Sequence, residues 1–284
     1  MIPVAFDYQR PSTVDEAVQS LVQAGEDAKV LAGGQSLLPV LRLRLSAPSV
    51  VVDLGRVAEL RGVREDGDAL VIGAMTTHHD VAADPLVRQY APLVAQATET
   101  VGDRQVRNVG TFGGSLAHAD PAGDLPAVAV ALDAELVIAG PGGRRTVPAR
   151  DFFVDYLTTS LAADEVLVEV RLPKLDGWGA HYEKFHRTAQ AWAIVGVAAA
   201  VRRSNGTITE ARVALTNMGP TPIRCGAVEL ALAGQTASAD AVAQAASHAA
   251  EGTSPASDLN ASPEYRQHLS RVLTRRALSA AAGL

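Results

Sequence analysis

Leu31-Ala32-Gly33-Gly34-Gln35-Ser36-Leu37 is the stretch that decides the fold, together with Gly110-Thr111-Phe112-Gly113-Gly114-Ser115 further along the chain. Tandem glycines let backbone N–H groups approach a diphosphate closely, because no Cβ is in the way. The hydroxyls of Ser36, Thr111 and Ser115 add further donors. The sequence therefore predicts two glycine-rich loops that could hold one dinucleotide between them.

Each glycine pair, taken alone, is also typical of a tight turn. Neither stretch is a Rossmann fingerprint, because no Gly-x-Gly-x-x-Gly opens a helix after a first strand, and no lysine of the Walker type follows either. A third cluster, Gly140-Pro141-Gly142-Gly143, lies between two strand-like runs and is predicted to be a hairpin turn.

The residues around the two loops predict alternating helices and strands. Thr13 and Glu16 have the spacing of a capping box, and apolar residues recur behind them at helical intervals, which predicts a helix over residues 13–24. The further elements expected before the second lobe are strands at 29–32 and 50–53, a hairpin of 61–64 with 69–72, a helix over 85–101, a buried helix at 125–132, and a hairpin of 135–139 with 145–147.

The composition changes after Pro173, and Leu175-Asp176-Gly177-Trp178-Gly179 is the expected joint between two lobes. Beyond the joint, the turn Ser204-Asn205-Gly206 predicts an antiparallel pair of strands. The elements expected there are strands at 194–201 and 208–215 and helices at 227–232, 239–251 and 263–281. This order indicates a second lobe of the α+β class.

Charge balance and cysteine usage exclude several classes of protein. The chain has 284 residues and a formal net charge of −6, which argues against nucleic acid or an anionic membrane surface as a partner. Cys225 is the only cysteine, so this chain alone can build neither a disulfide framework nor a four-thiolate iron–sulfur site. The start has no secretory signal and the longest apolar stretch, residues 193–201, is too short to span a bilayer, so we expect a cytoplasmic protein.

Several other stretches accompany the glycine-rich loops in a fixed order: Phe6-Asp7-Tyr8, Ile72-Gly73-Ala74-Met75-Thr76-Thr77, residues 107–124, Tyr182-Glu183-Lys184-Phe185 and Leu215-Thr216-Asn217-Met218-Gly219. With these stretches, nearly the whole chain resembles the medium, FAD-binding subunit of molybdenum hydroxylases such as carbon monoxide dehydrogenase and the relatives of xanthine dehydrogenase. Chance agreement of so many ordered segments is not expected.

The resemblance implies an α+β fold in two parts. A PCMH-type FAD-binding domain would cover residues 1–175, as two α/β subdomains at about 1–55 and 56–175 with FAD between them. A C-terminal α+β lobe of the CO dehydrogenase flavoprotein type would cover residues 178–284 and close over the isoalloxazine ring.

Site residues follow from the resemblance position by position. Those implied to contact the diphosphate and ribityl chain are Ala32, Gly33, Gly34, Gln35, Ser36, Leu37, Thr111, Gly113, Gly114 and Ser115. Asp124 would accept a hydrogen bond from the cofactor, and Val101 would lie near its ring system. Family members often have an acidic residue followed by Tyr or Phe where this chain has Ala191-Trp192, so Trp192 would cover one face of the flavin by stacking. A core tryptophan at a lobe interface is the alternative for Trp192.

No metal ligands or catalytic residues are predicted in this chain. His78-His79 and His118 with Asp120 lack a second pair at a recognised spacing, and local hydrogen bonding is the expected role of the latter two. No Gly-x-Ser-x-Gly elbow surrounds any serine of the loops, which argues against nucleophilic catalysis.

The function implied by the resemblance is electron transfer through FAD. Electrons would come from 2Fe-2S clusters in a small partner subunit, while a large partner subunit holds the molybdenum cofactor, and the assembly would be a dimer of heterotrimers. Two alternatives stay open: a free-standing FAD oxidoreductase of the same wider fold, and a structural subunit without flavin. The first needs catalytic side chains that the sequence does not show, and the intact glycine loops with Asp124 count against the second.

Overall fold

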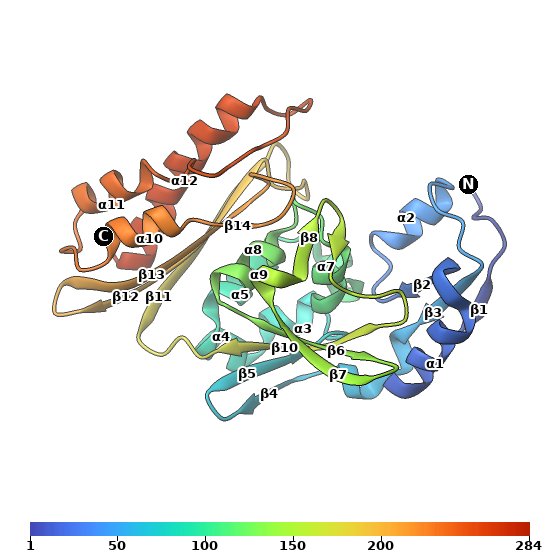
Figure 1. Ribbon diagram of the computed structural model, residues 1–284. Helices are drawn as coiled ribbons and strands as arrows, with labels where there is room; N and C mark the ends of the chain where they lie inside the picture. Colours follow the sequence, from blue (N-terminus) through green and yellow to red (C-terminus); the bar gives the residue numbers. More distant parts are fainter.

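The N-terminal part of the chain is a small parallel sheet covered by one helix. The computed structural model describes residues 1–284 without a gap, and Figure 1 shows this part at one end of the molecule. Helix α1 (Val14–Ala24) packs on the sheet through its buried apolar face, and Thr13 caps it by accepting a hydrogen bond from the N–H of Glu16. The strands pair in the order β1-β3-β2: β1 (Asp7–Gln9), β3 (Val50–Asp53) and β2 (Ala28–Leu31). Helix α2 (Leu37–Arg42) and three single-turn 3-10 helices, Gly25–Asp27, Leu54–Arg56 and Ala58–Leu60, complete this part.

The middle part is a five-stranded antiparallel sheet with helices packed against it. Its strand order is β4-β5-β10-β6-β7: β4 (Val63–Asp66), β5 (Ala69–Gly73), β10 (Val166–Pro173), β6 (Glu135–Gly140) and β7 (Gly143–Pro148). The helices are α3 (His78–Ala83), α4 (Pro85–Tyr90), α5 (Pro92–Glu99), α6 (Arg104–Val109), α7 (Phe112–His118), α8 (Asp124–Ala131) and α9 (Ala149–Phe152). A short pair, β8 (Phe153–Asp155) and β9 (Thr158–Thr159), precedes the return of the chain into β10.

The C-terminal lobe is a four-stranded antiparallel sheet with helices on its outer face (Figure 1). Its strands are β11 (Trp178–Phe185), β12 (Val195–Ser204), β13 (Thr207–Thr216) and β14 (Ile223–Arg224). Its helices are α10 (Gly226–Leu232), α11 (Ala239–Ala246) and α12 (Pro263–Ala282). Asn205 and Gly206 have φ of 51° and 79°, the left-handed pair that a two-residue hairpin turn between β12 and β13 requires.

The sheet of the C-terminal lobe is buried on both faces. Along β12, Val195, Val197 and Val201 point into the core beneath α10–α12, whereas Ala198 and Ala200 belong to the large core of the middle part. Neighbouring residues of a strand point to opposite faces, so alternating Val and Ala fill two cores at once. The small alanines allow α8, itself buried along its whole length, to pack closely on the sheet.

Most elements predicted from the sequence are confirmed, and three predictions are wrong in detail. The helix expected over residues 85–101 is two helices, because Pro92 has no N–H to donate and interrupts the run at Ala91. The helix expected over 239–251 ends as α11 at Ala246. The second glycine-rich stretch is the first turn of helix α7 and not a loop.

No helix in the structure has both the length and the apolar composition needed to cross a bilayer.

Candidate cofactor-binding site

The two glycine-rich stretches lie against each other in the structure. A Cβ added at Gly33 would lie 2.6 Å from the Cα of Gly110, which directly precedes the second stretch. A Cβ added at Gly114 would lie 3.2 Å from the Cβ of Ala32. Real Cβ atoms do not approach other atoms as closely as 2.6 Å, so only glycine fits at position 33, and a side chain at position 114 would press on Ala32. Two segments almost eighty positions apart in the sequence therefore form one surface.

The first stretch presents backbone donors without partners. Gly34 has a φ of 71°, a left-handed conformation that reverses the chain directly after β2. The N–H groups of Gly34, Gln35 and Ser36 have no hydrogen-bond acceptor within the chain, and the side chain of Ser36 makes no capping bond to α2. Consecutive free N–H groups of this kind form a concave site that suits an anionic oxygen.

The second stretch is more fully satisfied within the protein. Thr111 precedes α7 and its Oγ1 accepts a hydrogen bond of 3.2 Å from the N–H of Gly114. The N–H groups of Phe112 and Gly113 donate to the carbonyls of Thr76 and Ala74, each at 2.9 Å. The hydroxyl proton of Thr111 and the side chain of Ser115, which is half-buried, remain as donors of this stretch.

Asp124 stands at the start of α8 in a buried polar cluster. Its side chain is 3% exposed; Oδ1 accepts a hydrogen bond of 2.7 Å from the hydroxyl of Tyr182, and Oδ2 accepts one of 2.8 Å from Nζ of Lys184. Lys184 also donates to the carbonyl of Thr100 at 3.1 Å. Burial raises the pKa of Asp124, and the charge of Lys184 opposes this shift. The cluster joins the middle part to the first strand of the C-terminal lobe.

Tyr182 and Lys184 were not identified as site residues from the sequence, although a signal for them exists. They are two positions apart in β11 and therefore lie on the same face of the strand. A lone aspartate at the start of an all-apolar buried helix requires a partner, because buried charges are almost always paired. The two facts together would have pointed to a contact between β11 and α8.

Val101 and Trp192 differ in their surroundings. Val101 is half-buried against the core of the middle part, and it follows Thr100, whose carbonyl binds Lys184. Its own carbonyl accepts a hydrogen bond of 2.9 Å from Arg107. Trp192 is 55% exposed, which rules out the core tryptophan considered as its alternative.

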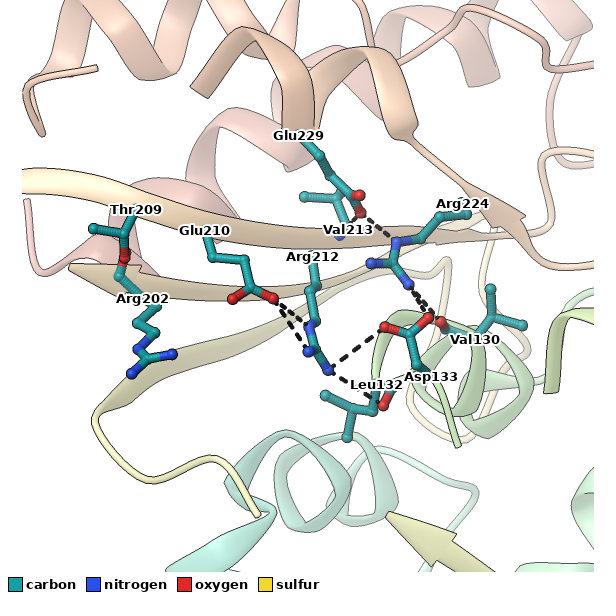
Figure 2. Close-up of polar contacts among 10 residues, drawn as sticks. All are labelled: Val130, Leu132, Asp133, Arg202, Thr209, Glu210, Arg212, Val213, Arg224 and Glu229. Atoms are coloured by element: carbon teal, nitrogen blue, oxygen red, sulfur yellow. Dashed lines mark hydrogen bonds and ion pairs between the residues drawn. The ribbon is translucent and has the colours of Figure 1, made fainter. Parts of the chain in front are cut away.

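The other end of α8 is also bound to the C-terminal lobe. Figure 2 shows that Arg224 donates to the carbonyl of Val130 at 2.9 Å and pairs with Asp133 at 2.8 Å. Arg212 reaches the carbonyl of Leu132 at 3.4 Å and Asp133 at 3.6 Å. Cations at a helix C-terminus satisfy the last carbonyls and complement the helix dipole. The C-terminal lobe thus holds α8 by both ends.

The surroundings of His118 and His78 are those of residues that support the fold. Nε2 of His118 lies 3.8 Å from Asp120, too far for a hydrogen bond, and Asp120 instead accepts one of 2.8 Å from the N–H of Ala122. His78 is buried beside Gly110, and burial lowers its pKa to about 4, so the imidazole is neutral at pH 7.

Two family models match the chain from end to end. Residues 4–175 match the FAD binding domain in molybdopterin dehydrogenase, and residues 180–281 match the CO dehydrogenase flavoprotein C-terminal domain. The chain belongs to the FAD-binding medium subunits of molybdenum hydroxylases. It contains the two matched parts in the order that the sequence resemblance implied.

Relatives of this medium subunit resemble it over their full length. The carbon monoxide dehydrogenase medium chain of Hydrogenophaga pseudoflava is 44% identical over 99% of this chain and 98% of its own. The caffeine dehydrogenase subunit beta of a Pseudomonas species is 36% identical over 99% and 96%. Among solved structures, carbon monoxide dehydrogenase from Hydrogenophaga pseudoflava superposes with a TM-score of 0.97 at 45% identity, covering 100% of this chain and 99% of that chain. Quinoline 2-oxidoreductase from Pseudomonas putida 86 superposes with a TM-score of 0.95 at 36% identity over 100% and 99%.

Proposed function

We propose that this medium subunit binds one FAD across the contact between its two glycine-rich stretches and relays electrons from iron–sulfur clusters of a partner to an external acceptor. FAD supplies the redox chemistry, while the protein supplies position and electrostatic environment. The observation that carries the proposal is the surface formed by Gly33 and Gly114, beside three consecutive backbone N–H groups without acceptors.

The residues of this surface fit the parts of the cofactor. The free N–H groups of the first stretch suit a diphosphate, which carries negative charge and accepts hydrogen bonds only. Lys184 and Asp124 form a buried pair at the start of α8, where they can orient a polar group of the cofactor, and Trp192 offers an exposed aromatic face to its ring system. The proposed contact set is Ala32, Gly33, Gly34, Gln35, Ser36, Leu37, Val101, Thr111, Gly113, Gly114, Ser115, Asp124 and Trp192.

The partners follow from what this chain lacks. Cys225 is its only cysteine and is buried, and burial raises the pKa of its thiol to about 12, so it is not available to ligate a cluster. Any iron–sulfur relay must then lie in another chain. We propose a small subunit with 2Fe-2S clusters and a large subunit with the molybdenum cofactor, assembled as a dimer of heterotrimers. The names of the relatives, medium chains and medium subunits, support this division.

The separate sheets of the structure support the proposed domain boundaries. A FAD-binding domain over residues 1–175, with subdomains at about 1–55 and 56–175, accounts for the separate three-stranded and five-stranded sheets. A C-terminal domain over residues 178–284 accounts for the four-stranded sheet and its helices.

The test is an absorption spectrum of the chain purified alone and again after co-expression with the products of neighbouring genes, followed by release of any flavin. Flavin bands, FAD released on denaturation, and iron–sulfur absorption that appears only with partners would support the proposal. Turnover by the chain alone would favour a free-standing oxidoreductase. A co-purified complex without flavin would leave a structural subunit as the explanation.

A further inference from the structure

Trp192 stands at the boundary between an exposed segment and the core. Its side chain is 55% exposed, whereas Ala193 and Ile194 directly after it are buried. Gln190 before it has a φ of 72°, which turns the chain sharply toward the tryptophan. A side chain with two rotatable angles takes its direction largely from its backbone. The groups that hold residues 193 and 194 therefore fix the backbone beside Trp192 and restrict the directions open to its side chain.

Asn217 holds the first of these two positions. Its Nδ2 donates a hydrogen bond of 2.7 Å to the carbonyl of Ala193, and its own N–H donates one of 2.8 Å to the carbonyl of Pro121. Pro121 lies in the connection between α7 and α8, between the second glycine-rich stretch and Asp124. Asn217 has a φ of 62°, a conformation that asparagine adopts more readily than most residues. One residue thus ties the tryptophan segment to the connection that joins the second glycine-rich stretch to Asp124.

Arg266 holds the second position. It lies on α12, is only 2% exposed, and donates through Nη1 to the carbonyl of Ile194 and through Nη2 to Asp258 at 2.8 Å. Burial acts to raise the pKa of Asp258, but hydrogen bonds from the N–H groups of Asn260 and Ala261 and from Arg266 lower it to about 2. The carboxylate therefore stays charged and keeps the buried guanidinium paired. The N–H of Ile194 is fixed as well, by the carbonyl of Phe185 at 2.8 Å.

We infer that Asn217 and Arg266 are positioning residues that aim Trp192 at the cofactor surface. Each anchors one of the two consecutive carbonyls after the tryptophan, from two different elements of the C-terminal lobe. The indole is then ordered before the ligand arrives, which lowers the entropy lost on binding. This inference rests on the proposed function, since it requires a flavin for Trp192 to meet.

A double-mutant cycle on FAD affinity tests the inference. Asn217→Gly keeps the left-handed backbone and the N–H bond to Pro121, and removes only the Nδ2 donor from the buried carbonyl of Ala193. We expect the dissociation constant for FAD to rise about tenfold in this variant, because the segment that carries Trp192 loses an anchor and must then be ordered on binding. In a Trp192→Ala background the same change should alter the dissociation constant by less than about twofold, because the residue acts through the tryptophan.

Equal effects of Asn217→Gly in both backgrounds, or no effect of Trp192→Ala on FAD affinity, would overturn the inference and leave the proposed function in place. A wild-type chain that binds no FAD, alone or with partners, would overturn the proposed function itself. FAD binding by the wild-type chain is measured first, so failure of the proposed function is recognised before the variants test the inference.

Quenching of tryptophan fluorescence by bound FAD separates a change in the position of Trp192 from a general loss of stability. Trp178 and Trp192 are the two tryptophans, so in a Trp178→Phe background the emission comes from Trp192 alone. We expect bound FAD to quench this emission, and Arg266→Lys to reduce the quenching at saturating FAD, because lysine keeps a charge but not the fork that reaches two acceptors. Leu273→Ala removes core volume from the same helix but leaves the hydrogen bond from Arg266 to Ile194 in place, and it should leave the quenching unchanged. Equal loss of quenching in both variants would overturn the inference.

Discussion

Replacing Lys184 by methionine tests how much the buried pair of Lys184 and Asp124 contributes to the free energy of unfolding. The side chains of Lys184 and Asp124 are 5% and 3% exposed, so the change leaves a carboxylate with little solvent and only Tyr182 as a partner. Removal of one member of a buried ion pair typically destabilises a protein by about 3–5 kcal/mol. We expect a loss of that size in the free energy of unfolding of the flavin-free chain at neutral pH, since methionine fills a similar volume and contributes no cavity.

The pH dependence of this loss has a definite sign. Burial already raises the pKa of Asp124 in the folded protein, and removal of the opposing Lys184 raises it further. A carboxyl whose folded pKa exceeds its unfolded value destabilises the fold at pH values above the folded pKa, and this effect disappears as the pH falls toward the unfolded value. The difference between the unfolding free energies of wild type and Lys184→Met should therefore narrow as the pH falls from neutral toward the unfolded pKa of about 3.9.

Urea denaturation at several pH values measures the effect, and Asp124→Asn in the Lys184→Met background provides the matched control. The amide oxygen can still accept the hydrogen bond of Tyr182 but carries no charge, so the double variant should recover about 2 kcal/mol or more of the loss. A loss below about 1 kcal/mol, the size expected of an exposed pair, would refute the reasoning. A loss of unfolding free energy that is the same at neutral and at acidic pH would refute the reasoning as well.

Three further predictions concern the glycine contact, the cysteine and the far end of α8. Gly114→Val should sharply weaken FAD binding with a smaller effect on the melting temperature, because its Cβ would press on Thr111 and Ala32; Gly142→Val, at an open hairpin position, should leave FAD titration unchanged. Cys225 should resist alkylation in the native chain at pH 8 and react fully in denaturant, since burial raises its thiol pKa to about 12. Arg224→Met should lower the unfolding free energy by about 1–3 kcal/mol, because it removes the hydrogen bond to the carbonyl of Val130 and the ion pairs with Asp133 and Glu229, and thermal unfolding measures the loss.

The sequence predicted what depends on local patterns. The helix that Thr13 begins and the hairpin around Asn205 follow from capping and turn chemistry that involve neighbouring residues only. The sequence predicts a loop for the second glycine-rich stretch because paired glycines are typical of tight turns. It is helical because Thr111 caps it, which is a local signal, and the helix packs closely on Ala74 because Gly113 has no Cβ, which is a tertiary contact that glycine spacing does not reveal.

In the candidate site, too, the sequence reveals local patterns but not contacts between distant residues. The two glycine pairs were found because their type and order are visible in the chain, but the polar cluster around Asp124 joins residues about sixty positions apart. No local pattern specifies which lysine or tyrosine pairs with a given aspartate. The argument that would have found the cluster is energetic, because an aspartate inside an apolar helix must be paired somewhere.

The arrangement of these contacts explains why medium subunits of enzymes with different substrates can share one structure. Relatives named for carbon monoxide, caffeine and glyceraldehyde dehydrogenases are 44%, 36% and 36% identical to this chain. The contacts that shape the surface, from Gly33 on Gly110 to Lys184 on Asp124, all run between elements of this chain. None of them requires a substrate or a partner residue to be satisfied. The geometry at α8 and the glycine-rich stretches is therefore determined within this chain.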